Sequence, residues 1–141
     1  MAGPTSVIYS VTAHATGGRD GKVHCDGDHL WTAMAIPKAM GGSGLGATPE
    51  DLFAMGYASC FNSALLFVAG QKKLDASKAK VSCEVGIGRN EAGGFALQAR
   101  LSVKIPGLDA TQAKELVEAA HQVCPYSNAT RGNMPVELVI E

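Results

Sequence analysis

Two cysteines are the residues of this chain whose types and positions most clearly suggest a chemical reaction. Cys60 stands in the middle of a long apolar stretch, and Cys124 stands at the end of a second, amphipathic stretch, directly before Pro125. If both stretches are helices that pack together, the sulfurs could approach each other, and a disulfide demands Cα atoms roughly 4.4–6.8 Å apart. Spacing alone does not decide this, because free cysteines are also common as small buried hydrophobic residues. The pair indicates either a redox couple or two core thiols.

The apolar stretch, residues 48–70, is expected to form the central helix. Thr48 can cap its start, and Pro49 suits the first helical position. Glu50 and Asp51 place negative charge at the positive end of the helix dipole. Apolar residues fall on all sides of the helix, so it must be buried all round. One small domain cannot cover both sides, which indicates that a second copy of the chain covers the other.

The remaining pattern predicts an α+β fold, with two main helices packed on antiparallel sheets. A second helix is expected from the cap Asp109 to about Cys124, because its apolar residues recur at i, i+3, i+4 and i+7. Pro125 should end it, and the SNATRGN segment after it should form a loop. The expected strands, separated by turn signals, are 6–15, 22–25, 30–36, 80–89, 95–105 and 136–140.

Length, charge and composition exclude several classes of protein. The 141 residues predict one domain, 1–141, and a net charge of -1 with scattered basic residues gives no footprint for nucleic acid. No apolar run of about 18 residues is free of polar interruption, so no membrane span is expected. No signal-peptide pattern opens the chain, and four cysteines without C-x-x-C spacing predict no zinc knuckle. We therefore expect a cytoplasmic protein.

Two further patterns could suggest a bound group, and neither is favoured. The glycine-rich segment 37–47 lacks the Gly-Lys-Ser/Thr ending of a phosphate-binding loop, so we expect a flexible loop beside a site. A metal site would need irregular spacing of its candidate ligands, His14, His24, Cys25 and His29. We expect no bound metal or organic cofactor. Cys25 and Cys83 are expected to take no part in the chemistry, and His121 to lie at the surface of the second helix.

Three motifs in the chain resemble a known family. The segments TPEDLFAMGYASCF (48–61) and VCPYSNATRGN (123–133), with GGRDG (17–21) upstream, look like the organic hydroperoxide resistance (Ohr) branch of the Ohr/OsmC family of thiol peroxidases. The similarity runs over essentially the whole chain, and the motifs occur in the family's order. The CPYSNATRGN segment is more typical of the Ohr branch than of OsmC proper. The resemblance implies an OsmC-like fold and an intertwined homodimer.

The resemblance also implies a mechanism. Cys60 would be the peroxidatic cysteine, whose thiolate attacks the distal oxygen of an organic hydroperoxide and releases the alcohol. The resulting sulfenic acid would condense with Cys124, the resolving cysteine. A dithiol would then reduce the disulfide, and in this family that is dihydrolipoamide or a lipoylated protein. Arg19 and Glu50 match the family's activating pair.

An activating cation has a physical reason. Only a thiolate is nucleophilic, and burial in an apolar helix should raise the pKa of Cys60, so a guanidinium is needed nearby. Arg19 cannot lose its proton, and Glu50 would hold it and offset its buried charge. The alternatives are an arginine that pairs with Asp20 in its turn and a glutamate that serves only the helix dipole.

Glu50 and Cys60 are too far apart on one straight helix for a single arginine to touch both. Ten residues correspond to about 15 Å along the axis and roughly 80° around it. We therefore expect a shared site, in which Glu50 of one chain lies near Cys60 of the other across two antiparallel helices. A large kink between the two residues is the competing explanation.

An apolar substrate pocket is expected beside Cys60, which would favour bulky or fatty-acid hydroperoxides over hydrogen peroxide. Its expected lining residues come from the central helix and the glycine-rich segment: Phe53, Tyr57, Phe61, Met40 and Leu45. Three other functions stay open. The chain could be a non-catalytic redox sensor or stress-binding protein that uses the same dithiol, a peroxidase of the OsmC branch, or a structural dimer with two core cysteines.

Overall fold

The computed structural model describes residues 3–141. Contacts within the chain divide it into two compact units, Met1–Pro49 and Glu50–Glu141. The elements of the first unit are β1 (Ala13–Thr16), the 3-10 turn η1 (Gly18–Asp20), β2 (Lys22–Cys25), β3 (Trp31–Ala33) and η2 (Lys38–Met40). Those that follow are α1 (Pro49–Lys72), β4 (Lys80–Arg89), β5 (Phe95–Lys104), α2 (Ala110–Val123), α3 (Pro125–Thr130) and β6 (Val136–Ile140).

The sheet of the first unit is an antiparallel meander, as expected, but it is shorter than predicted. Its strand order is β1-β2-β3. The prediction of a strand over 6–15 was wrong for residues 6–12, because β1 starts at Ala13, which pairs with Cys25 at the end of β2. Residues 7–11 therefore have no strand partner in the described chain, although they carry exposed apolar side chains such as Ile8, at 97% exposure.

The glycine-rich segment 37–47 folds back on the end of β3. Met34 forms an isolated parallel bridge with Ala47, and β3 ends at Ala33 rather than at the predicted Ile36. The Ala47 N–H donates to the carbonyl of Ala33 at 2.9 Å. Backbone hydrogen bonds thus close the segment into a defined loop.

The sheet of the second unit is mixed rather than antiparallel. β4 and β5 pair antiparallel from Lys80↔Lys104 to Arg89↔Phe95, as the hairpin pattern predicted. β6 pairs with β5 in parallel, so the expectation of antiparallel sheets was wrong for this pair. The connection explains the difference. α2 and α3 carry the chain back between the two strands, and a helical crossover of this kind joins parallel strands.

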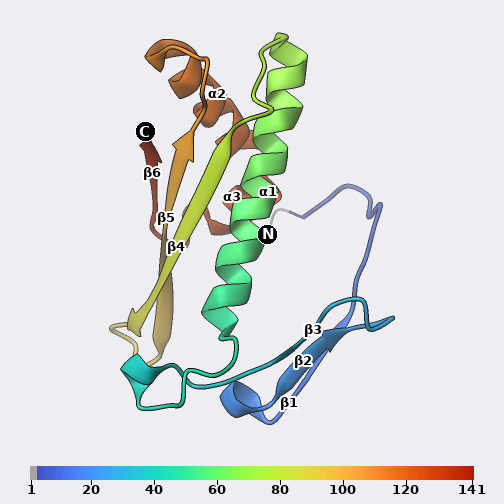
Figure 1. The fold of residues 1–141 in the computed structure, drawn as a ribbon, viewed down its shortest axis with the longest axis vertical. Helices are drawn as coiled ribbons and strands as arrows, with labels where there is room; N and C mark the ends of the chain where they lie inside the picture. The colour runs from blue at the N-terminus through green and yellow to red at the C-terminus, as the bar shows by residue number, and fades with distance from the viewer. Residues whose placement is uncertain (1–2) are drawn as a thin grey trace. The chain divides into compact units, whose positions relative to one another are not determined.

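The core of the second unit lies where α1 and α2 cover one face of this sheet (Figure 1). Alternate residues of β5 point into it, because successive side chains of a strand face opposite ways. Leu101 and Val103 are fully buried, whereas Arg100 beside them is exposed. The helices contribute the other large buried residues, which are Tyr57, Phe61, Leu65, Leu116 and Val117.

α2 and α3 meet at Cys124, where the sequence predicted a helix followed by a loop. Asp109 caps α2 as expected, since its carboxylate accepts the N–H of Gln112 at 2.8 Å in a capping box. The loop prediction for the SNATRGN segment was wrong over its first residues. Pro125 ends α2 but also starts α3, and proline suits the first turn of a helix because no intrahelical N–H is needed there.

α1 is apolar all round, but the chain buries only part of it. Phe61 and Leu65 are fully buried, while Met55 and Phe67 are 60% and 59% exposed. By length and composition alone this helix could span a membrane, a property that it shares with the core helices of many soluble proteins. Its buried residues belong to the core cluster of the second unit, so α1 is a core helix with one open side.

Candidate active site

The structure brings the two candidate cysteines into contact. The Sγ atom of Cys124 lies 3.7 Å from the Sγ atom of Cys60, within hydrogen-bonding distance for sulfur. Cys124 is fully buried, and Cys60 is partly exposed. Both are free thiols, and a covalent S–S bond of about 2.05 Å would need only a small approach of the two sulfurs. The structure thus places two free thiols in direct contact.

Cys124 owes its position to the residue that follows it. Proline disfavours a helical backbone in the preceding residue, and Cys124 accordingly has an extended backbone, with ψ at 120°. Cys124 is therefore both the C-cap of α2 and the N-cap of α3. Its N–H donates to the carbonyl of Ala120, and its own carbonyl accepts the N–H of Asn128, both at 2.9 Å. The sulfur is thus held at a fixed corner between two helices.

The surroundings of Cys60 within this site oppose its ionisation. Burial raises the pKa of the Cys60 thiol above its ordinary value, and the neighbouring Cys124 thiol raises it further. One group acts in the other direction: the backbone N–H of Tyr126 donates a hydrogen bond to the Cys60 sulfur and lowers its pKa. The net direction is upward, so a reactive thiolate needs a positive charge in addition.

Tyr126 also connects Cys60 to an aromatic cluster. Its ring lies 6.1 Å from that of Phe53 and 5.7 Å from that of Tyr57, between ring centroids. Gly56 makes this approach possible, since a Cβ there would lie 2.6 Å from the Tyr126 hydroxyl oxygen. No pattern in the sequence predicts this contact, because a hydrogen bond made by the backbone leaves no side-chain signal.

A largely apolar cavity of about 780 Å³ opens beside the aromatic cluster. Phe53, Phe95 and Tyr126 line it with Met134 and Leu97, among others. Tyr126 is common to the cavity and the thiols, because its ring lines the one and its N–H faces the other.

The residues predicted to line a pocket are placed differently from one another. Phe53 lines the cavity, whereas Tyr57 and Phe61 are fully buried in the core. Met40 and Leu45 belong to the first unit and are 50% and 88% exposed there. The helical wheel could not separate these cases, because α1 is apolar on every side.

A buried hydroxyl network beside the cysteines was not predicted. The Tyr57 hydroxyl lies 3.0 Å from Ser127 Oγ and 3.1 Å from Thr130 Oγ1, and His121 Nδ1 lies 2.9 Å from Ser127 Oγ. His121, expected at the surface, is partly buried, and burial followed by the Arg131 cation lowers its pKa. The three-residue spacing of Ser127 and Thr130 would place both hydroxyls on one face of a helix. This signal was missed because the segment was predicted to be a loop.

Arg19 and Glu50, the predicted activating pair, lie in different units. Arg19 belongs to η1, a turn in which a Cβ on Gly21 would lie 1.7 Å from the Thr16 carbonyl oxygen, so the glycine is required. Glu50 stands in the first turn of α1. α1 runs as one continuous helix past Cys60, which leaves no break between Glu50 and Cys60 that could bring them together.

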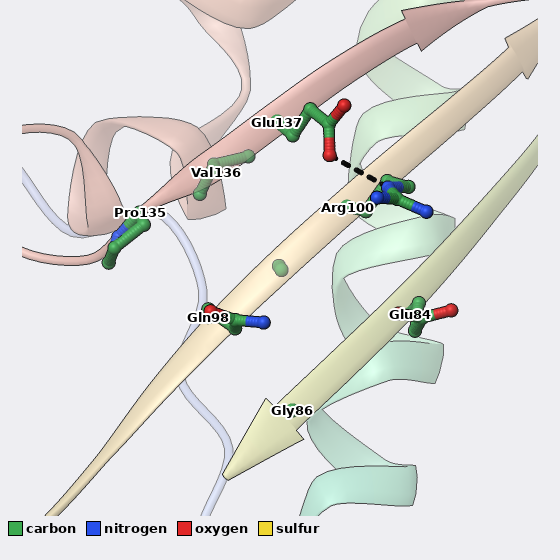
Figure 2. A pocket seen from close by; sticks show the side chains of 8 residues that line it. Glu84, Gly86, Gln98, Arg100, Pro135, Val136 and Glu137 are labelled. Carbon is green, nitrogen blue, oxygen red and sulfur yellow. Dashed lines mark hydrogen bonds and ion pairs between the residues drawn. The ribbon is translucent and has the colours of Figure 1, made fainter. Parts of the chain in front are cut away.

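A second hollow, on the sheet face opposite the core, is polar (Figure 2). Glu84, Arg100 and Glu137 stand side by side on β4, β5 and β6, and Arg100 Nε donates to Glu137 Oε2 at 2.7 Å. This hydrogen bond and the Glu137 charge raise the pKa of Arg100. None of the residues that line the hollow is a cysteine, so the dithiol has no part in it.

The other candidate ligands and thiols do not assemble a further site. Within residues 3–141, no three His, Cys, Asp or Glu side chains are grouped so that they could hold a metal ion. His14 Nε2 instead lies 2.7 Å from Asp26 Oδ1. Cys25 and Cys83 are partly buried free thiols, and burial raises the pKa of Cys83.

Comparison with known proteins agrees with the motifs. The family model of OsmC-like proteins matches residues 41–139. An organic hydroperoxide resistance protein of Xanthomonas axonopodis pv. citri is 44% identical over 142 residues, which cover 99% of each chain. The organic hydroperoxide resistance protein OhrB of Bacillus subtilis is 38% identical over 95% of this chain and 98% of its own.

Solved structures extend the likeness to the fold. The crystal structure of an organic hydroperoxide resistance protein from Elizabethkingia anophelis is 46% identical, with a TM-score of 0.93 over 97% of this chain and 99% of that one. The crystal structure of OhrB of Bacillus subtilis has a TM-score of 0.85 over 96% of this chain and 100% of its own. The α+β fold is thus shared with these proteins, and the chain belongs to the Ohr/OsmC family, in its organic hydroperoxide resistance branch.

Proposed function

We propose that this chain is a thiol peroxidase that reduces organic hydroperoxides, lipid hydroperoxides included, to alcohols. The observation that carries the proposal is the 3.7 Å contact between the sulfurs of Cys60 and Cys124. The names of the relatives, which refer to organic hydroperoxide resistance, support the substrate class.

In the proposed cycle, the two electrons that reduce the hydroperoxide pass through thiol and disulfide groups alone. The Cys60 thiolate attacks the distal oxygen of the hydroperoxide, the O–O bond breaks, and the alkoxide leaves as the alcohol after it takes up a proton. The Cys60 sulfenic acid then reacts with the Cys124 thiol, which forms the S–S bond and releases water. An external dithiol reduces this disulfide by two exchange steps and becomes a disulfide itself. No bound metal or organic cofactor is needed, because both electrons pass through sulfur.

Ionisation of Cys60 is the step that needs help from outside its own helix. Burial and the Cys124 thiol raise its pKa, and the Tyr126 N–H alone does not offset them. We assign the missing positive charge to Arg19, oriented by Glu50. Because Glu50 and Cys60 lie about 15 Å apart along a continuous α1, Arg19 would bridge Glu50 of one chain and Cys60 of another.

A homodimer follows from the same proposal. α1 leaves Met55, Leu66 and Phe67 exposed, and a second copy of α1 packed antiparallel would cover them. The unpaired apolar segment 7–11 offers a further strand-like surface, which an intertwined partner would pair and bury. Both features support two copies that exchange contacts along their length.

The preferred substrate should be apolar. The cavity of about 780 Å³ beside Tyr126 is lined mainly by aromatic and aliphatic side chains, which suit a bulky or acyl substituent. Hydrogen peroxide would gain nothing from such a lining. Cumene, tert-butyl and fatty-acid hydroperoxides should therefore be reduced with a higher kcat/KM than hydrogen peroxide, and equal values would contradict the apolar cavity.

The reductant and the compartment come from the resemblance and from the composition. We assign recycling to dihydrolipoamide or a lipoylated protein as electron donor. The cytoplasm suits a protein whose cysteines must return to the dithiol, because that compartment keeps thiols reduced.

One experiment tests the enzyme against its alternatives. The reduced protein is mixed with one equivalent of cumene hydroperoxide, thiols are counted, and turnover is then followed with dihydrolipoamide in excess. We expect loss of two thiols per chain, repeated consumption of hydroperoxide, and no consumption by Cys60→Ser. A redox sensor would lose the thiols without repeated turnover, and a structural dimer would lose none.

A further inference from the structure

Three helices of the second unit meet in a chain of buried hydroxyl groups next to the dithiol. Tyr57 comes from α1, His121 from α2, and Ser127 and Thr130 from α3. Tyr57 and Ser127 are fully buried, and Thr130 is 5% exposed. The Thr130 hydroxyl donates to the Ser127 carbonyl at 3.2 Å, in addition to the three contacts already described.

The hydroxyl protons of this hydrogen-bond network can be assigned from the donors and acceptors that each group offers. A carbonyl only accepts, so the Thr130 proton goes to the Ser127 carbonyl and Thr130 Oγ1 must accept from the Tyr57 hydroxyl. Tyr57 has then used its one proton and must accept from the Ser127 hydroxyl. Ser127 Oγ in turn accepts from His121, whose Nδ1 therefore carries a proton. Every hydroxyl in the chain donates once and accepts once.

Three of the four network members lie one helical turn from a cysteine. Tyr57 precedes Cys60 by three residues on α1, and His121 precedes Cys124 by three residues on α2. Ser127 follows Cys124 by three residues on α3. The hydrogen bonds thus join the helix that carries one sulfur to both helices that meet at the other. A shift of α1 against the α2–α3 corner would break at least one of them, and each broken bond would leave a buried polar group unpaired.

We propose that Tyr57, Ser127, Thr130 and His121 are positioning residues that hold the Cys124 sulfur against Cys60 and so set how fast the sulfenic acid is resolved. This inference rests on the proposed peroxidase cycle and adds residues to it. Tyr57, Ser127 and His121 are not among the residues that line the apolar cavity, whereas Thr130 is one of them. The effect of the network should fall on disulfide formation, and Tyr57→Phe, which leaves the cavity lining unchanged, should also leave the first oxidation of Cys60 unchanged.

Two reactions compete for the Cys60 sulfenic acid. In one, the Cys124 thiol attacks the sulfenic sulfur, the S–O bond breaks, and the hydroxide leaves as water with the thiol proton. In the other, a second hydroperoxide transfers an oxygen atom, which gives a sulfinic acid and one more molecule of alcohol. The first reaction is intramolecular and depends on sulfur placement, whereas the second depends on hydroperoxide concentration. The ratio of sulfinic acid to disulfide therefore reports the placement of Cys124.

Two substitutions at Thr130 separate hydrogen bonding from packing. Thr130→Val keeps the shape of the side chain and removes its hydroxyl, whereas Thr130→Ser keeps the hydroxyl and removes a methyl group. Because a misplacement of about 1 Å can slow a reaction roughly a hundredfold, we expect disulfide formation to slow roughly ten- to a hundredfold in Thr130→Val. Thr130→Ser should resolve at the wild-type rate.

Tyr57→Phe tests the same hydrogen-bond network at the residue that α1 contributes. It deletes the only hydroxyl that joins α1 to α3 in the network, and it should match Thr130→Val in its excess of sulfinic acid over disulfide. Tyr9→Phe removes a tyrosine hydroxyl that lies outside the network, so it is the matched control and should resolve its sulfenic acid at the wild-type rate. Each reduced protein is mixed with increasing cumene hydroperoxide, and sulfenic acid (trapped with dimedone), disulfide and sulfinic acid are quantified by intact mass spectrometry. Thermal unfolding of each variant is recorded alongside.

The outcomes distinguish this inference from the function on which it rests. Slow resolution in Thr130→Val and Tyr57→Phe, with first oxidation in Tyr57→Phe as in wild type, supports the positioning role. Wild-type resolution in either variant, or equal defects in Thr130→Val and Thr130→Ser, would overturn it while the peroxidase cycle stands. Failure of cumene hydroperoxide to oxidise Cys60 in the wild-type protein would instead overturn the cycle itself. If one of the two hydroxyl-deficient variants fails to fold, the other gives the same comparison from a different helix.

Discussion

Replacing Gly56 with alanine should reveal how tightly α1 and α3 are packed next to Cys60. The new Cβ would lie 2.6 Å from the Tyr126 hydroxyl oxygen and 3.1 Å from two of its ring carbons. Ordinary contacts begin at 3.4 Å, so the tyrosine must retreat by roughly 0.8 Å. Gly70, on the same helix, has no atom within 4 Å of such a Cβ and is a matched control.

Two opposing effects set the size of the change. Alanine is more favourable than glycine inside a helix by about 1 kcal/mol, and this gain applies at both positions. Overpacking at Gly56 costs about 1 to 3 kcal/mol. Tyr126 is 37% exposed, so its ring has a way outward and the cost should fall in the lower part of that range. We expect Gly56→Ala to be neutral or destabilising by up to about 1 kcal/mol, whereas Gly70→Ala stabilises by about 1 kcal/mol.

A double-mutant cycle with Tyr126→Ala isolates the contact. With the ring removed, Gly56→Ala should stabilise the protein as much as Gly70→Ala does. The cycle should give a coupling of about 1 to 2 kcal/mol, measured by urea unfolding at one protein concentration. Equal stabilisation by Gly56→Ala and Gly70→Ala with Tyr126 present would refute the reasoning.

Three further predictions concern charge and assembly. Arg19→Gln should move the alkylation profile of Cys60 to higher pH and lower peroxidase activity, while Arg19→Lys should retain part of both; an unchanged profile would exclude Arg19 as the activating cation. If the proposed dimer forms through the open side of α1, Phe67→Asp should yield monomers in light scattering and reduce activity, while Phe67→Leu should do neither. Burial and the Arg131 cation lower the pKa of His121, so the unfolded chain takes up that proton first as the pH falls. The free energy of unfolding should then decrease as the pH falls below about 6.5, less so in His121→Gln, and ¹⁵N NMR should show the Nδ1–H form.

Local signals in the sequence were enough for the helices and the hairpin. The cap at Asp109, the start of α1 at Pro49 and the bounds of β4 all agree with the structure, because each depends on residues within one or two turns. The same local logic was misleading at Pro125, which can end one helix and begin the next. It was also misleading at 6–15, where the strand-forming residues before Ala13 have no partner strand.

The sequence by itself determined the family, the residue types of a dithiol and the apolar helix that carries one of its sulfurs. Only the tertiary structure decided that Cys124 reaches Cys60, that the Tyr126 N–H faces that sulfur, and that β6 runs parallel to β5. The physical reason is distance along the chain. The two thiols are 64 residues apart, and the hydroxyls that join α1 to α3 are 70 and 73 apart, so no pattern of neighbouring residues encodes their contact.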